Sequence, residues 1–116
     1  MTLSKAFKAI VDTGAHTSVI PVSIWQGLQV DIKVKDTSFG GINNRPECLI
    51  PTSLGMVRCL LTDETGALGP ELEILSFLAK TDQVPLILGF ADLLSKFEIC
   101  FDYGSGKAFA RSPSET

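Results

Sequence analysis

Short runs in which apolar and polar residues alternate make up much of this chain. In residues 30–35, valine and isoleucine alternate with aspartate and lysine, which is the two-residue period of a half-buried strand. Other strands are predicted where short apolar runs lie between turn-forming residues. These runs are residues 8–11, 18–20, 51–61, 72–78, 85–89, 98–101 and 107–111. The pattern therefore predicts a mainly β fold.

Two short helices are predicted between the strands. Pro21 suits a helix start, because the first turn does not use its N–H position, and residues 22–26 would follow before Gly27 ends the helix. Near residue 90 the apolar spacing changes to i, i+3, i+4 and i+7, which marks one face of a second helix whose start Asp92 would cap. The residues with this spacing are Phe90, Leu93, Leu94 and Phe97.

Two segments rich in glycine predict hairpin tips. Residues 39–46 hold two glycines and two asparagines, which tolerate positive φ, and residues 102–106 hold two glycines between two predicted strands. The sequence contains no repeat or linker that would divide it. We therefore expect one domain, residues 1–116, with residues 112–116 as a flexible tail and a barrel-like arrangement of the strands.

Composition and charge exclude several classes of function. Hydrophobic residues are 45% and charged residues 20% of the chain, which fits an ordered globular domain. The net charge is −3 and the ten lysines and arginines are scattered, so nucleic-acid binding is not expected. No apolar run reaches the roughly 18 residues that span a bilayer, and residues 1–5 do not begin a secretory leader. We expect a cytoplasmic protein without a membrane partner.

Few residues are available for metal chemistry or for a Ser-His-Asp triad. The three cysteines, Cys48, Cys59 and Cys100, have no CxxC spacing and are expected to be reduced thiols. The single histidine, His16, is expected to shape its turn or to face solvent rather than to act as a base. We therefore expect no metal and no organic cofactor.

A carboxylate stands on a tight turn near the start of the chain. Asp12-Thr13-Gly14 follows the apolar residues 9–11 and precedes Ala15. Aspartate and glycine also favour ordinary turns at strand ends, and that interpretation stays open for this tripeptide alone. Two other segments accompany it in chain order. They are the glycine-tipped segment 39–42 and the run 86–89, which leads into the second predicted helix.

Taken in order, these three segments resemble the retropepsin-like aspartic proteases over roughly residues 9–109. The resemblance implies a closed, barrel-like acid-protease fold with a flap hairpin and one or two short helices, which forms half of a symmetric dimer. It also implies that Asp12 is the catalytic acid and that Thr13 locks the turn across the dimer. Gly14 lets backbone N–H groups approach the carboxylate.

The resemblance assigns roles to two further sets of residues. A flap would cover the substrate, although the same glycines would make a simple hairpin loop without the Asp12 turn. The substrate-binding residues would be Ala15, Phe39, Gly40, Gly41 and Ile42. A supporting strand would cross beneath the turn. Its residues would be Ile87, Leu88 and Gly89.

The chemistry of amide hydrolysis requires a pair of carboxylates at such a site. Without a metal or a nucleophilic side chain, one group must take a proton from the attacking water while another gives a proton to the scissile carbonyl. Two crowded carboxylates share one proton and can do both. The chain has one Asp-Thr-Gly, so the second Asp12 must come from another copy in a homodimer. We expect an aspartic endopeptidase that cleaves extended polypeptides.

The start of the chain departs from the family pattern. Eleven residues precede Asp12, whereas the family has a further strand and turn, which residues 1–5 are not expected to supply. Either the start is truncated, or another segment replaces that strand; the hairpin of residues 98–111 can do so, with its edge pairing across the two-fold axis. Two alternatives stay open: a catalytically inactive, protease-like dimerisation or peptide-binding module, and an unrelated small β-barrel with a chance turn motif.

Overall fold

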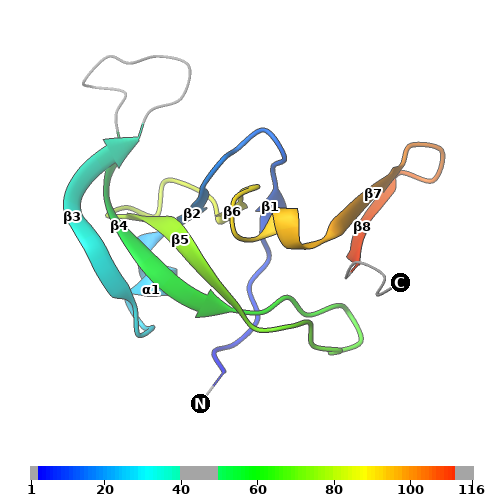
Figure 1. Cartoon of the computed structure of the whole chain (residues 1–116), viewed down its shortest axis with the longest axis horizontal. Helices are drawn as coiled ribbons and strands as arrows, with labels where there is room; N and C mark the ends of the chain where they lie inside the picture. The colour runs from blue at the N-terminus through cyan, green and yellow to red at the C-terminus, as the bar shows by residue number, and fades with distance from the viewer. Residues whose placement is uncertain (1–2, 40–49, 112–116) are drawn as a thin grey trace.

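Strands dominate the computed structural model, which describes residues 3–39 and 50–111. The mainly β prediction is confirmed, and the observed strands lie within a few residues of the predicted ones (Figure 1). The elements are β1 (Ile10–Val11), β2 (Ser18–Ile20), α1 (Val22–Trp25), β3 (Asp31–Phe39), β4 (Ile50–Cys59), β5 (Leu72–Ala79), β6 (Ile87–Leu88), the 3₁₀ turn η2 (Leu94–Lys96), β7 (Glu98–Asp102) and β8 (Lys107–Arg111).

Six strands form one mixed sheet in the order β1-β6-β2-β5-β4-β3 (Figure 1). β3, β4 and β5 are antiparallel neighbours, whereas β2 is parallel to β5 and β1 is parallel to β6. β1 and β3 are the two edges, so the sheet stays open within residues 3–39 and 50–111. The expected closed barrel is therefore wrong for this part of the chain. Closure needs continuous pairing between the edges, and β1 offers only two residues for it.

The hydrophobic core joins the middle strands to the segment after β6. Its buried residues include Leu78 and Leu93, each 0% exposed, and α1 adds Ile24 and Trp25 to its boundary. The Trp25 indole N–H donates to the Ala79 carbonyl oxygen at 2.7 Å. This bond ties the short α1 helix to the end of β5. The remaining buried members of the cluster are Ile20, Val57, Ile74 and Leu94.

The β3 strand is present as predicted, and the burial of its apolar side decreases along the strand. Val30, which directly precedes β3, packs against the core, whereas Ile32 is 38% and Val34 46% exposed. β3 is an edge strand, and its pairing with β4 shifts register on both sides of Val34. Such irregularities twist an edge strand, and the alternation in sequence does not reveal them. The two-residue period therefore predicted the strand, but not the loss of core contact along it.

The predicted second helix is wrong, because residues 90–93 form turns before the 3₁₀ segment η2. Asp92 has φ 63°, a left-handed conformation that an α-helix does not contain. Its Oδ2 accepts a hydrogen bond from the Leu75 N–H at 3.2 Å, so Asp92 links this turn to β5 instead of capping a helix. Leu93 and Leu94 are still buried, whereas Phe90 is 52% exposed.

Replacing Asp92 by alanine is expected to lower the free energy of unfolding by about 1–3 kcal/mol, because the Leu75 N–H loses its acceptor and alanine disfavours positive φ. Asp92→Asn keeps an acceptor oxygen and tolerates this conformation, so its cost is expected to stay below about 1 kcal/mol. Urea unfolding followed by circular dichroism measures both variants. Equal costs for the two variants would contradict this explanation.

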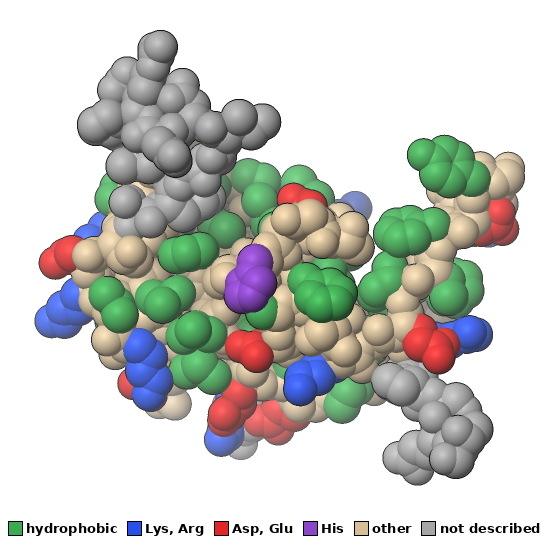
Figure 2. All heavy atoms as spheres, turned by 45° about the horizontal axis from the view of Figure 1, so that its top comes forward, with side chains coloured by type: hydrophobic (Ala, Val, Ile, Leu, Met, Phe, Trp, Pro, Cys, Tyr) green, Lys and Arg blue, Asp and Glu red, His purple; other side chains and the backbone are tan. Residues whose placement is uncertain are grey.

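β7 and β8 form a separate two-stranded hairpin, here called the arm, which projects from the side of the molecule (Figure 1). Its register places Glu98 opposite Arg111 and Asp102 opposite Lys107, as predicted for a hairpin. Figure 2 shows hydrophobic side chains exposed along it. Phe101 is 63%, Phe109 53% and Tyr103 99% exposed. An isolated two-stranded hairpin is marginally stable in water, and Ile99 of the arm packs against the hydrophobic core.

The segments expected to be a tail and a hairpin tip fall partly beyond the part of the chain that the structure describes. Residues 112–116 and residues 40–49 lie outside it. Within residues 3–39 and 50–111, none of the helices has the length and apolar character needed to cross a membrane.

Candidate functional site

Asp12 directly follows β1 and opens a hydrogen-bonded turn. The Asp12 N–H donates to the Leu88 carbonyl at 3.1 Å, and the Ala15 N–H donates to the Asp12 carbonyl at 3.1 Å. The Gly14 N–H donates to the carboxylate Oδ1 at 3.0 Å. Asp12, Thr13 and Gly14 are all exposed. The carboxylate is therefore held by its own turn and stays accessible on the surface of the single chain.

Gly14 has no side chain where space is restricted by the carboxylate. A Cβ atom added at this position would lie 3.3 Å from the Asp12 Oδ1. That approach is tighter than normal packing, so a larger residue would move the carboxylate or lengthen the Gly14 N–H contact. Glycine at this position thus permits the hydrogen bond between its own N–H and the Asp12 carboxylate.

β6 holds this turn in place through backbone pairing with the strands on either side of the turn. It lies between β1 and β2: Val11 pairs with Leu88 on one side, and Val19 pairs with Ile87 on the other. A Cβ atom at Gly89 would lie 2.6 Å from the Thr17 carbonyl carbon. The structure therefore brings Ile87, Leu88 and Gly89 together with the Asp12 turn (Figure 1).

Ser18 contributes a contact that the sequence alone did not indicate. Its Oγ accepts a hydrogen bond from the Gly89 N–H at 2.9 Å, and the residue is only 1% exposed. In the sequence, Ser18 is simply the first residue of a short strand. The available signal was a hydroxyl at the start of a short predicted strand, because a hydroxyl that is buried there needs a hydrogen-bond partner.

The predicted flap residues are only partly described. Phe39 ends β3 and pairs with Ile50 of the antiparallel β4, which is the strand arrangement of a hairpin. Gly40, Gly41 and Ile42 lie outside the described residues. Ala15, the remaining predicted substrate-binding residue, lies in the Asp12 turn and accepts a hydrogen bond from the Phe90 N–H at 2.8 Å.

Within residues 3–39 and 50–111, neither the histidine nor a cysteine is hydrogen-bonded to the Asp12 carboxylate. His16 is exposed, and its Nδ1 lies 3.0 Å from the Thr17 Oγ1. Cys59 and Cys100 are free thiols, and burial raises the pKa of the Cys59 thiol. Cys48 lies outside the described residues. Across residues 3–39 and 50–111, no three His, Cys, Asp or Glu side chains are grouped to hold a metal ion.

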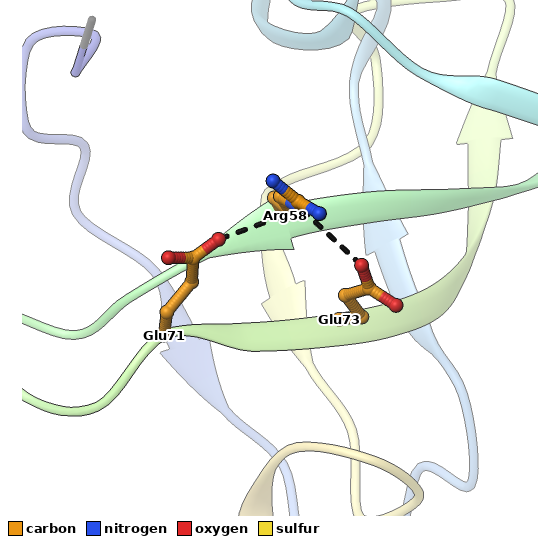
Figure 3. A network of polar contacts seen from close by, with 3 residues as sticks. All are labelled: Arg58, Glu71 and Glu73. Atoms are coloured by element: carbon orange, nitrogen blue, oxygen red, sulfur yellow. Dashed lines mark hydrogen bonds and ion pairs between the residues drawn. The ribbon is translucent and has the colours of Figure 1, made fainter. Parts of the chain in front are cut away.

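An apolar cavity of about 760 Å³ lies between residues 3–9 and the core, and Asp12 does not line it. Arg58 and Glu71 border the cavity, and Figure 3 shows Arg58 between Glu71 and Glu73. The Arg58 Nε lies 3.4 Å from Glu71 Oε1 and 3.2 Å from Glu73 Oε1. These side chains are about half exposed, so the ion pairs contribute little to stability. The cavity and the Asp12 turn are therefore separate features.

Comparisons with protein-family models, with curated proteins and with solved structures found no match to this chain.

Proposed function

We propose that this chain is a retropepsin-like aspartic endopeptidase that acts as a symmetric homodimer. The observation that carries the proposal is the Asp12 turn, in which an exposed carboxylate accepts the Gly14 N–H directly after a strand that pairs with β6. Asp63 and Asp102 also accept backbone N–H groups in their turns, so this bond alone does not distinguish Asp12. What distinguishes the Asp12 turn is its support by β6 and by the close approach of Gly89 to Thr17, which suits a group that must keep its position during proton transfer.

In the proposed mechanism, the two Asp12 carboxylates of a dimer share one proton. The ionised carboxylate takes a proton from water while the water oxygen bonds to the scissile carbonyl carbon, and the protonated carboxyl gives its proton to the carbonyl oxygen. The tetrahedral intermediate then releases the amine as the C–N bond breaks, with a proton passing to the leaving nitrogen.

The proposal retains the acid-protease arrangement in which an extended polypeptide binds between the flap and the pair of acids. Phe39, Gly40, Gly41 and Ile42 would form the flap, and Ala15 would contact the substrate beside Asp12. Ile10 and Val11, which directly precede the acid, are each 52% exposed. Exposed aliphatic residues beside the acid support an apolar contact there, with a second subunit or with apolar substrate side chains.

The arm is the proposed contact with the second copy. Ile99 lies opposite Ala110 and Phe101 opposite Ala108, so these four residues share one apolar face. Ile99 packs against the core, and this face continues outward from it to the exposed Phe101. The arm thus offers an apolar surface of the kind that a symmetric interface covers.

The charges of the arm favour packing through this face over pairing through an edge. Two antiparallel copies of β8 centred on Phe109 would place Lys107 of one chain beside Arg111 of the other. Two copies of β7 centred on Cys100 would likewise oppose Glu98 and Asp102. Like charges directly opposite are unfavourable in a sheet. The proposed dimer therefore packs the apolar faces of two arms together and does not pair their strand edges, which the sequence had suggested.

Phe101→Asp is expected to raise the dimer dissociation constant at least about tenfold, because it places a charge in the apolar face. Phe101 is 63% exposed, so the fold of the monomer should be unaffected. Leu68→Asp is the matched control, since Leu68 is 59% exposed and lies in the loop before β5. Sedimentation equilibrium measures dimerisation. A chain ending at Phe97 that still forms dimers would overturn this role of the arm.

A second candidate function is a dimerisation or peptide-binding module without catalysis. The exposed apolar arm favours it, because an interaction surface alone would explain that feature. The two candidates differ at Asp12. A module does not need this carboxylate, whereas the peptidase does.

The test is incubation of the purified protein with a diverse peptide mixture at several pH values between about 4 and about 7. Mass spectrometry identifies new termini. We expect internal cleavage whose specific activity rises with protein concentration as monomers pair. The Asp12→Asn variant, purified identically, distinguishes this activity from a contaminating protease. Absence of new termini at every concentration would overturn the proposal.

A further inference from the structure

Three consecutive backbone N–H groups after β6 donate to residues 15–18, the loop after the Asp12 turn together with the first residue of β2. The Gly89 N–H donates to the Ser18 Oγ at 2.9 Å. The Phe90 and Ala91 N–H groups donate to the carbonyls of Ala15 and His16, each at 2.8 Å. Together with the Asp12 N–H bond to Leu88, these bonds fix both ends of the loop to one short stretch of chain.

Ser18 differs from the other three contacts because it acts through its side chain. The residue is 1% exposed, so its oxygen does not exchange freely between Gly89 and water. Gly89 passes so close to the loop that a Cβ atom there would lie 2.8 Å from the Ser18 backbone N. The hydroxyl and the missing side chain together determine how closely residues 88–91 approach the loop.

We infer that Ser18 is a positioning residue for the reaction, acting through Gly89 to set the place of the Asp12 carboxylate. The inference rests on the proposed function. In a symmetric dimer, a displacement of the Asp12 turn from the two-fold axis occurs in both subunits, so the spacing between the acids changes by twice as much. Proton sharing depends on that spacing, whereas substrate binding along the flap does not.

The test compares the parent protein with Ser18→Ala and Ser18→Thr. Ser18→Ala is expected to lower kcat about tenfold while KM stays within about twofold, since the acids are displaced but the substrate contacts remain. Ser18→Thr keeps the hydroxyl and is expected to restore kcat.

Amide hydrogen exchange gives a second measurement that does not require activity. Ser18→Ala is expected to speed exchange at Phe90 and Ala91 at least about tenfold, with Val57 and Ile74 of the core unchanged. Ser53→Ala is the matched control, because Ser53 is a 5% exposed serine of β4 whose hydroxyl bonds the Lys35 carbonyl. It should leave kcat and these two amides unaffected.

The outcomes separate this inference from the proposed function. Parental exchange rates at Phe90 and Ala91 in Ser18→Ala would overturn the inference, as would an equal loss of kcat in Ser53→Ala. If the parent protein cleaves no peptide, the proposed function fails and Ser18 positions no reaction, while the exchange rates still decide whether it holds the turn.

Discussion

Replacing Asp12 by asparagine is expected to reduce peptide cleavage at least about 100-fold while leaving the dimer intact, because a neutral amide cannot take a proton from water. Asparagine has nearly the same shape, and its side-chain oxygen can still accept the Gly14 N–H. Asp31→Asn is the matched control, since Asp31 is an exposed aspartate of β3. Cleavage rates on one peptide and sedimentation of each variant complete the comparison.

Mixing the subunits tests whether one site uses an acid from each chain. With about nine Asp12→Asn subunits for each parent subunit, about one in ten parent subunits pairs with another parent subunit. The mixture should therefore keep about one tenth of the activity that the same amount of parent protein has alone. The mixture must first exchange subunits, which dilution and reconcentration allow.

Two results would count against a shared pair of acids. Unchanged activity in the exchanged mixture would mean that each chain carries a complete site. Full cleavage by Asp12→Asn alone would remove Asp12 from the mechanism and leave the dimerisation module as the better explanation of the arm.

Gly89→Ala is expected to cost about 3 kcal/mol or more of unfolding free energy and to abolish cleavage, because the added methyl group meets backbone atoms. The three nearest atoms belong to Thr17 and Ser18 and lie 2.6–2.9 Å from the ideal Cβ position. These atoms cannot rotate away as a side chain would. Small domains are stable by only about 5–15 kcal/mol, so the loss is large.

Gly27→Ala provides the matched control for Gly89→Ala. A Cβ atom at Gly27 meets nothing within 4 Å, so alanine there should change stability by less than about 1 kcal/mol and in the favourable direction. Thermal unfolding of both variants measures the difference. A Gly89→Ala protein with parental stability would show that the loop can move away from β6, and the support described for Asp12 would then be absent.

The sequence predicted the parts of this site that local patterns determine, and it did not predict the contacts between residues that are distant along the chain. The turn at Asp12-Thr13-Gly14 and the strand before Gly89 follow from aspartate, glycine and short apolar runs, and both are present. The helix predicted over residues 90–97 failed because Asp92 bonds Leu75, which is distant in sequence. The contact between Ser18 and Gly89 is also long-range. Periodicity reports on neighbours along the chain and cannot reveal such pairs.

The wrong prediction of a closed barrel also arose because periodicity reports only on neighbours along the chain. Strand patterns identify β1 and β3 but do not tell whether two edges meet, because that depends on strand length and register. β1 is two residues long in the structure, whereas the apolar run in the sequence suggested four. The sequence thus located most strands and left their lateral arrangement undetermined.

The insertion of β6 between β1 and β2 has a consequence for biosynthesis. Ser18 and Gly89 are 71 positions apart, so the N-terminal part of a nascent chain emerges from the ribosome long before its central strand exists. The Asp12 N–H then lacks its acceptor, the Leu88 carbonyl. Under the proposed function, a growing polypeptide is therefore proteolytically inert until residues 86–91 have emerged and a second copy has paired with it.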